Sequence, residues 1–166
     1  MNISKFTQKS VEILNNLEKI AYDFGAQEIA QEHLLYGMLT VEDSLIKKLI
    51  EKMEIDSDVF LAQVEGAVRK RPQVQGGQVY IGQDLNKVLV YAENEAKALG
   101  DEYVSVEHLF LSLLRKPSKE IKQLFHDFQI DRERFLQALS KVRGNQKVTT
   151  DNPEAVYDSL NKYGYD

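Results

Sequence analysis

The chain has 166 residues, and 43% of them are hydrophobic, which is enough for a packed core and argues against global disorder. Its net charge of −5 has the wrong sign for a protein that neutralises phosphates, so we expect no nucleic-acid partner. It has no cysteine, hence no disulfide or thiolate chemistry, and no apolar run of about 18 residues, so we expect a cytoplasmic protein without a membrane partner.

The first part of the chain predicts four helices. The first of them has one inward stripe at helical spacing: Ile13, Leu14, Leu17, Ala21 and Phe24. It should end at Gly25, because glycine adopts the left-handed conformation that terminates helices. The next helices should begin near Gln31, near Asp43 and at Asp56, the last of which suits an N-cap.

The second part predicts the same pattern after a linker, residues 72–81, that contains Gly76-Gly77 and few apolar residues. Its first helix again has an inward stripe: Leu85, Val88, Leu89, Ala92, Ala96 and Leu99. That helix should end at Gly100, and three more should begin near Ser105, near Pro117 and at Asp131.

The two parts are copies of one unit. Glu32-His33-Leu34 recurs 75 positions later as Glu107-His108-Leu109. The same shift, without a gap, pairs further identical residues: Gln8 with Gln83, Leu14 with Leu89, Glu18 with Glu93, Ala21 with Ala96, Gly25 with Gly100, and Phe60-Leu61 with Phe135-Leu136. We therefore predict an all-α domain, residues 1–143, of eight helices in two four-helix repeats (about 1–71 and 82–143) related by a pseudo-two-fold axis. The short inter-repeat linker, residues 72–81, should keep the repeats together as one unfolding unit.

Residues 144–166 should be a linker that leads towards a further module of a longer chain. Residues 144–151 are polar and lack a helical stripe, so we expect them to be mobile and to be cut first by proteases. Asn152-Pro153-Glu154 predicts the start of a short helix.

No motif for catalysis is present. No glycine is followed by lysine, so there is no Walker A motif, and we expect neither a catalytic residue nor a cofactor in this chain. The histidines His33, His108 and His126 lack the one-turn spacing of metal ligands. We expect no metal, and we expect His33 and His108 to form local bonds at the start of their helices.

Three residues admit two interpretations. Glu32 and Glu107 either stabilise a helix dipole, worth about 0.3–1 kcal/mol, or face outward and receive a cation from a partner. Tyr91 lies off the inward stripe of its helix. It is either an isolated surface aromatic or part of a site for apolar polypeptide.

The doubled Glu-His-Leu motif resembles the N-terminal (Clp-N) domain of the Clp ATPases. Other segments resemble the ClpB branch most closely: Phe6-Thr7, Arg71-Pro72-Gln73-Val74, Gly100-Asp101, Val142-Arg143-Gly144 and the tail from Tyr157 to Gly164. The resemblance implies a substrate-engaging domain that binds unfolded or aggregated protein for disaggregation. It also implies downstream ATPase modules that use ATP, a full-length homohexamer that works with DnaK in the stress response, and a monomeric N-terminal fragment.

The resemblance also implies a binding site where the repeats meet. Thr7 matches a surface threonine at the head of the first helix, Asp101 and Glu107 match an acidic pair, and Glu32 is the counterpart of Glu107. With Tyr91 they make the predicted substrate-binding set, whose acidic rim should disfavour acidic stretches of substrate.

Two alternatives remain open. ClpC-type domains dock adaptors and receive phosphorylated arginine on both glutamates, but they have threonine before each glutamate, where this chain has Gln31 and Val106. An enzyme that uses the two Glu-His pairs is the other alternative.

Overall fold

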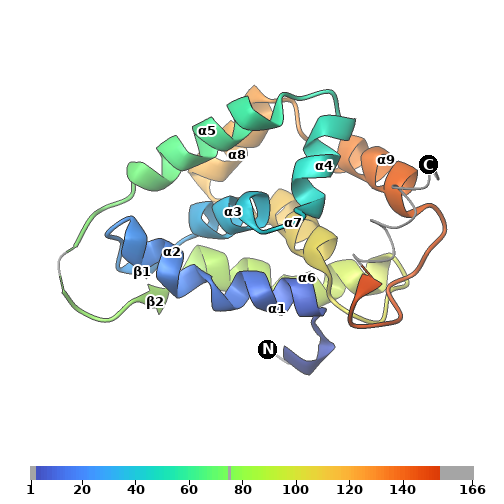
Figure 1. The fold of residues 1–166 in the computed structure, drawn as a ribbon, viewed down its shortest axis with the longest axis horizontal. Helices are drawn as coiled ribbons and strands as arrows, with labels where there is room; N and C mark the ends of the chain where they lie inside the picture. Colours follow the sequence, from blue (N-terminus) through green and yellow to red (C-terminus); the bar gives the residue numbers. More distant parts are fainter. Residues whose placement is uncertain (1–2, 75, 154–166) are drawn as a thin grey trace.

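The computed structural model describes residues 3–74 and 76–153, and the predicted helix at Asn152-Pro153-Glu154 falls largely outside them. The domain is all-α (Figure 1). After a short turn of 3₁₀ helix, η1 (Ile3–Lys5), the first repeat contains α1 (Gln8–Asn15), α2 (Leu17–Asp23), α3 (Gln31–Thr40), α4 (Leu45–Lys52) and α5 (Ser57–Arg69). The second repeat contains α6 (Gln83–Ala98), α7 (Val106–Arg115), α8 (Lys119–Asp127) and α9 (Arg132–Arg143).

The predicted eight-helix pattern is confirmed, with one interruption. α1 and α2 together occupy the place of the continuous α6, and they are separated at Asn16, whose φ is −90° and ψ −5°. Asparagine is a poor helix former, and two of them stand here, Asn15 and Asn16. The apolar stripe crosses the break, since Ile13 and Leu17 on either side of it are both buried.

The predicted helix ends match the local chemistry closely. Gly25 and Gly100 both have φ of 72°, the left-handed conformation expected after a helix. Asp131 caps α9 by accepting from the Arg134 amide at 2.8 Å, and Asp56 caps α5 in the same way. The third helix of each repeat begins slightly later than predicted, because serines cap them: Ser44 for α4 and Ser118 for α8.

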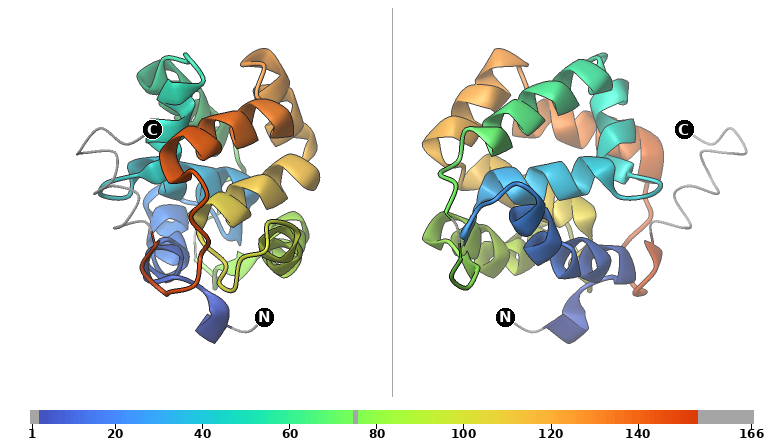
Figure 2. Two further views of the ribbon diagram at one scale, coloured as in Figure 1. Left: turned by 90° about the vertical axis from the view of Figure 1, so that its right-hand side faces the viewer. Right: turned by 60° about the vertical axis from the view of Figure 1, so that its left-hand side comes forward.

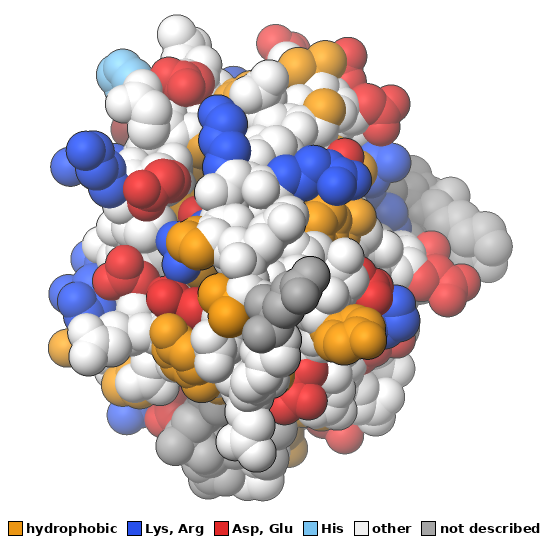
Figure 3. Space-filling model, turned by 90° about the vertical axis from the view of Figure 1, so that its left-hand side faces the viewer, with side chains coloured by type: hydrophobic (Ala, Val, Ile, Leu, Met, Phe, Trp, Pro, Cys, Tyr) orange, Lys and Arg blue, Asp and Glu red, His pale blue; other side chains and the backbone are white. Residues whose placement is uncertain are grey.

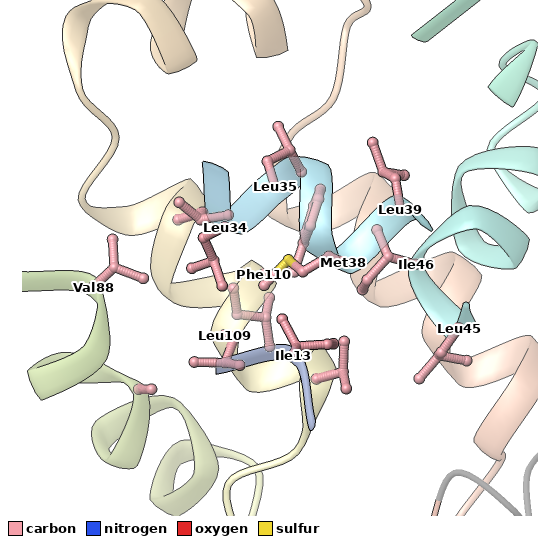
Figure 4. Packing of buried hydrophobic residues seen from close by; sticks show 14 of the residues in the cluster. Ile13, Leu34, Leu35, Met38, Leu39, Leu45, Ile46, Val88, Leu109 and Phe110 are labelled. Carbon is pink, nitrogen blue, oxygen red and sulfur yellow. The ribbon is translucent and has the colours of Figure 1, made fainter. Parts of the chain in front are cut away.

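Both repeats contribute to one core. α3 and α7, the helices with the Glu-His-Leu motif, lie at its centre (Figure 1). Figure 4 shows Leu34, Leu35 and Met38 of α3 beside Leu109 and Phe110 of α7. All five side chains are fully buried and belong to one hydrophobic cluster, so the two repeats share a single core.

The repeats also exchange short extended segments. β1 (Glu28–Ile29) of the first repeat pairs in parallel with β2 (Tyr80–Ile81), which leads into the second. Conversely, Phe6 of the first repeat forms a parallel bridge with Val104 of the second. The two connections are equivalent: the Gly82 amide donates to the Ile29 carbonyl at 2.9 Å, and 75 positions earlier the Thr7 amide donates to the Val104 carbonyl at 2.9 Å. The segment before each repeat's first helix is therefore bound to the other repeat.

The chain after α9 is held against the domain, contrary to the prediction of a mobile segment. We call residues 145–151 the strap. Val148 is fully buried, its amide donates to Oδ1 of Asp101 at 2.9 Å, and its carbonyl accepts from the Glu102 amide at 2.8 Å. The strap then reaches α1, where the Gln8 amide donates to the Asp151 carbonyl at 2.7 Å (Figure 2). The polar composition of the strap did not reveal this, because backbone hydrogen bonds and the single apolar side chain of Val148 hold it in place.

Candidate binding surface

Two adjacent apolar residues are exposed on α6. Val90 is 53% exposed and Tyr91 39%, whereas the inward stripe of the same helix is buried. At the equivalent positions of the first repeat stand Asn15 and Asn16. The repeat fold therefore does not require apolar side chains at these positions. Their presence on the surface of α6 points to contact with a partner rather than to packing within the domain.

A lysine covers the Tyr91 ring. The Nζ atom of Lys116, at the end of α7, lies 4.7 Å from the centroid of the ring, within the range of a cation–π interaction. Lys116 is held in place from the other repeat. The buried Gln31 donates from Nε2 to the Lys116 carbonyl at 2.9 Å and accepts from the Ser118 amide at 2.8 Å.

Gln31 also fixes the start of α6. Its Nε2 donates to the Asp84 carbonyl at 2.9 Å, so one amide side chain joins α3, α6 and the α7–α8 corner. From the sequence, Gln31 was predicted to begin a helix and was otherwise noted only as a departure from the threonine of ClpC-type domains. Its role could not be read from the sequence, because all three of its partners lie more than 50 positions away.

One turn beyond Tyr91, a buried carboxylate carries two cations. The side chain of Glu95 is 2% exposed, contacts Nε of Arg115, and accepts from Nη1 of Arg132 at 2.7 Å. Burial alone would raise the pKa of Glu95, but the two guanidinium groups outweigh burial and hold the pKa below its usual value. The sequence signal was present but overlooked: an acid lies within the apolar arc between Ala92 and Ala96.

Glu32 lies on the wall of a groove between the repeats. The groove, of about 590 Å³, runs between α5 and α8, and charged side chains of both signs line it, among them Lys70 and Lys119. The Glu32 side chain is only 2% exposed and lies 3.8 Å from Nη1 of Arg71. Burial raises the pKa of Glu32, and the charge of Arg71 offsets only part of this effect.

Asp101 and Glu107 meet in the interior of the second repeat. Arg143 joins them: its Nη2 donates to Asp101 at 2.5 Å and its Nη1 to Glu107 at 3.2 Å. Asp101 also contacts Nε2 of His108 at 2.7 Å. Burial alone would raise the pKa of Asp101, but hydrogen bonds from His108, Arg143 and the Val148 amide hold it well below its usual range.

Glu32 and Glu107 therefore do not face outward. In both repeats an arginine near the end of the fourth helix covers the motif glutamate, but Arg71 and Arg143 are not at equivalent positions. The acidic rim predicted from these residues is absent from the described surface, because the side chains of Asp101 and Glu107 are 0% exposed.

Thr7 is also buried. It caps α1, accepting from the Ser10 amide at 3.3 Å, and its own amide is bound to Val104. Thr7 thus lies close to the Asp101 cluster, because its partner Val104 is three residues along the chain from Asp101. Tyr91 and Glu32 lie elsewhere, near the α7–α8 corner to which Gln31 is hydrogen-bonded.

Both motif histidines form the expected local bonds. Nδ1 of His33 accepts from the Ala30 amide, and Nδ1 of His108 from the Ser105 amide, each at 2.8 Å. Over residues 3–74 and 76–153 no cluster of three or more His, Asp and Glu could hold a metal ion. Over the same residues no helix is long and apolar enough to cross a bilayer.

The inter-repeat linker adds a second apolar area. Val74, Tyr80 and Ile81 are each about half exposed. Figure 3 shows this face: hydrophobic side chains lie across its middle, among Lys, Arg, Asp and Glu of both signs. Ile81 lies just before α6, and Tyr91 is about 12 Å further along that helix at its rise per residue.

The family model of the Clp repeat (R) N-terminal domain matches residues 5–128. Among curated proteins, the chain is 41% identical to the chaperone protein ClpB of Nitratidesulfovibrio vulgaris and 38% identical to that of Bacillus cereus ATCC 10987. In both cases 100% of this chain aligns with 20% of the relative, so the chain spans about a fifth of the length of these relatives.

Solved structures share the fold. The Hsp104 N-terminal domain of Candida albicans superposes with a TM-score of 0.79 at 20% identity, covering 90% of this chain and 99% of that one. A complex of the ClpV N-domain with a VipB peptide superposes with a TM-score of 0.67 at 20% identity, covering 83% of this chain and 86% of that one.

Proposed function

The chain belongs to the Clp repeat N-terminal domain family and is a Clp-N domain of the ClpB type, and from that premise we propose that it engages unfolded or aggregated polypeptide for disaggregation. The observation that carries the proposal is the exposed Val90-Tyr91 pair, which the fold does not require. An exposed apolar pair beside the junction of two repeats suits an extended apolar segment. The ClpV N-domain, a relative in fold, is solved with a bound peptide, which supports the same kind of partner.

In this proposal Tyr91 makes the contact, and the other predicted residues position the surface. Glu32 borders the groove beside the Gln31 corner, and Thr7, Asp101 and Glu107 keep the second repeat and the strap in register. The linker residues Val74, Tyr80 and Ile81 extend the apolar area. Binding should be weak, about micromolar or weaker, because an unfolded segment loses conformational entropy when it is ordered.

A longer protein that contains this domain would supply the remaining functions. We propose that its ATPase modules bind ATP and form a homohexamer that acts with DnaK in the cytoplasm. The domain itself would act as a monomer without a cofactor. The ClpC-type alternative has no specific support, because Glu32 and Glu107 each have an arginine partner within the domain.

The test is an NMR titration of this chain with a synthetic unfolded polypeptide rich in Leu and Phe. We expect the shifted amides to cluster around Tyr91 and Lys116, and Tyr91→Ala to weaken binding without lowering the melting temperature. Tyr22→Ala is the matched control, since Tyr22 is 80% exposed on α2 in the other repeat. Equal weakening by both substitutions, or shifts confined to the far end of α9, would show that the site is misplaced.

A further inference from the structure

The surroundings of Tyr91 also indicate which segments fit. Resting on the proposed function, we propose that the surface selects unfolded segments in which an aromatic or branched apolar side chain is flanked by Asp or Glu, and that Lys116 binds the flanking carboxylate. The apolar side chain would lie against Val90 and Tyr91, and the carboxylate would pair with the ammonium group at the edge of the ring.

Lys116 is placed for this role by the fold. Its ammonium group lies over the Tyr91 ring at 4.7 Å, and its backbone is fixed by the buried Gln31. In the described part of the chain Lys116 has no carboxylate within ion-pair distance, and its ammonium group contacts the ring face of Tyr91. A carboxylate arriving next to the ring would therefore gain a partner without breaking an existing ion pair.

The remaining charges beside Tyr91 act in the same direction. The acid one turn later, Glu95, is buried and already neutralised by Arg115 and Arg132, which leaves two cations on one carboxylate. One turn earlier, the exposed Lys87 is 3.9 Å from the exposed Asp84, a weak pair that balances itself. Among these side chains cations therefore outnumber carboxylates, on a chain whose net charge is −5.

The first repeat shows that this arrangement is not a requirement of the fold. At the positions of Tyr91, Glu95, Arg115 and Lys116 it has Asn16, Ile20, Thr40 and Val41. The aromatic ring, the buried acid and both cations are therefore found together in one repeat and are replaced together in the other. A purely structural arrangement would be expected in both, because the two repeats share one helical plan apart from the break at Asn16.

The sign of this preference is opposite to the one predicted from the sequence. An acidic rim of Asp101, Glu107 and Glu32 would repel acidic segments, but these carboxylates are buried and paired with arginines. The charged group that covers the Tyr91 ring is a cation, the ammonium of Lys116. Electrostatic complementarity at such a rim acts mainly on specificity and on the association rate.

The experiment uses three fluorescent peptides with one shared Leu- and Phe-containing core and with flanks of Asp and Glu, of Ser and Gly, or of Lys and Arg. Binding to this chain is measured by anisotropy. We expect the acid-flanked peptide to bind about two- to fivefold more tightly than the neutral one, the gain typical of an exposed ion pair. The advantage should shrink between about 0.05 M and 0.5 M salt, because salt screens exposed charges.

Variants connect the preference to one residue. Lys116→Gln should remove the advantage of the acid-flanked peptide, and Lys116→Glu should transfer it to the base-flanked peptide. Lys141→Gln is the control, an exposed lysine on α9 away from Tyr91. Circular dichroism checks that each variant is folded.

The outcomes separate the two proposals. If all three peptides bind equally and Lys116→Gln changes nothing, while Tyr91→Ala still weakens binding, the preference for acidic flanks is wrong and the proposed function stands. If none of the peptides binds, both proposals fail. If the base-flanked peptide binds best, the sign of the preference is wrong.

Discussion

The two motif histidines occupy equivalent positions, but only one has a partner on its outer nitrogen. Nε2 of His108 contacts Asp101 at 2.7 Å, whereas Nε2 of His33 is buried and has no hydrogen-bond partner among the described residues. Ala26 stands where the second repeat has Asp101, and both backbones make the same bond: the Ala26 amide to Ala21 at 2.8 Å and the Asp101 amide to Ala96 at 2.9 Å. Ala26→Asp should therefore give His33 the missing carboxylate.

The effect can be estimated from the pKa of His33. Burial, and then the nearby charge of Arg71, lower this pKa from 6.5 to about 4. The unfolded chain therefore binds the proton more tightly than the folded one, and stability rises with pH between about 4 and 6.5. The full difference is worth about 3 kcal/mol, and about 2 kcal/mol of it is lost when the pH falls from 7 to 5. In Ala26→Asp the new carboxylate should raise the pKa of His33 and remove most of this loss.

Two measurements check this reasoning. An NMR titration follows the imidazole protons of His33 in the parent chain and in Ala26→Asp, and urea unfolding at pH 7 and pH 5 gives the change in stability. His33→Gln is the control, since a chain without the titrating group should lack this share of the pH dependence. A titration of His33 near 6.5 in the parent chain would refute the lowering of its pKa by burial. An unchanged titration in Ala26→Asp would refute the assumed equivalence of Ala26 and Asp101.

Three other substitutions test the contacts that hold the domain together. Gln31→Ala removes three hydrogen bonds between the repeats and should lower the free energy of unfolding by about 1–3 kcal/mol, measured in urea, while Gln123→Ala on the exposed face of α8 should have little effect. Arg143→Met leaves two buried carboxylates without their cation and should lower the free energy of unfolding by about 3–5 kcal/mol. The control Arg69→Met, at an exposed position, should lower it by less than about 0.5 kcal/mol, and similar losses for the two would contradict the buried network. Val148→Ser should release the strap and speed tryptic cleavage within it, and equally fast cleavage of the parent chain would show that the strap is not docked.

The fold could be predicted from the sequence because its signals are local or repeated. The apolar stripes, the glycines Gly25 and Gly100 and the caps Asp56 and Asp131 each act within a turn or two of helix. Because the same pattern recurs 75 positions later, each helix predicted in one repeat was supported by its counterpart in the other. Signals of this kind need no knowledge of distant contacts.

The environment of the carboxylates could not be predicted, because it depends on partners far along the chain. Arg143 lies 36 positions from Glu107 and 42 from Asp101, and no spacing rule connects them. Glu32 and Glu107 consequently looked like exposed first-turn acids. The exposure of Tyr91, in contrast, could be predicted, because helical periodicity alone places it off the inward stripe of its helix.

The docked strap also determines how this domain can move. Asp151 is held beside Gln8, so the chain enters and leaves at one pole, while the inter-repeat linker lies at the opposite end of the helix pair α1 and α2, about 24 Å away (Figure 1). A longer protein that contains this domain would hold it by this pole, because the described chain is still docked here and Pro153 is buried. Val74, Tyr80 and Ile81 lie at the end far from that attachment, so a rotation about the pole would displace them most, and it would displace Tyr91, nearer the middle of α6, by less.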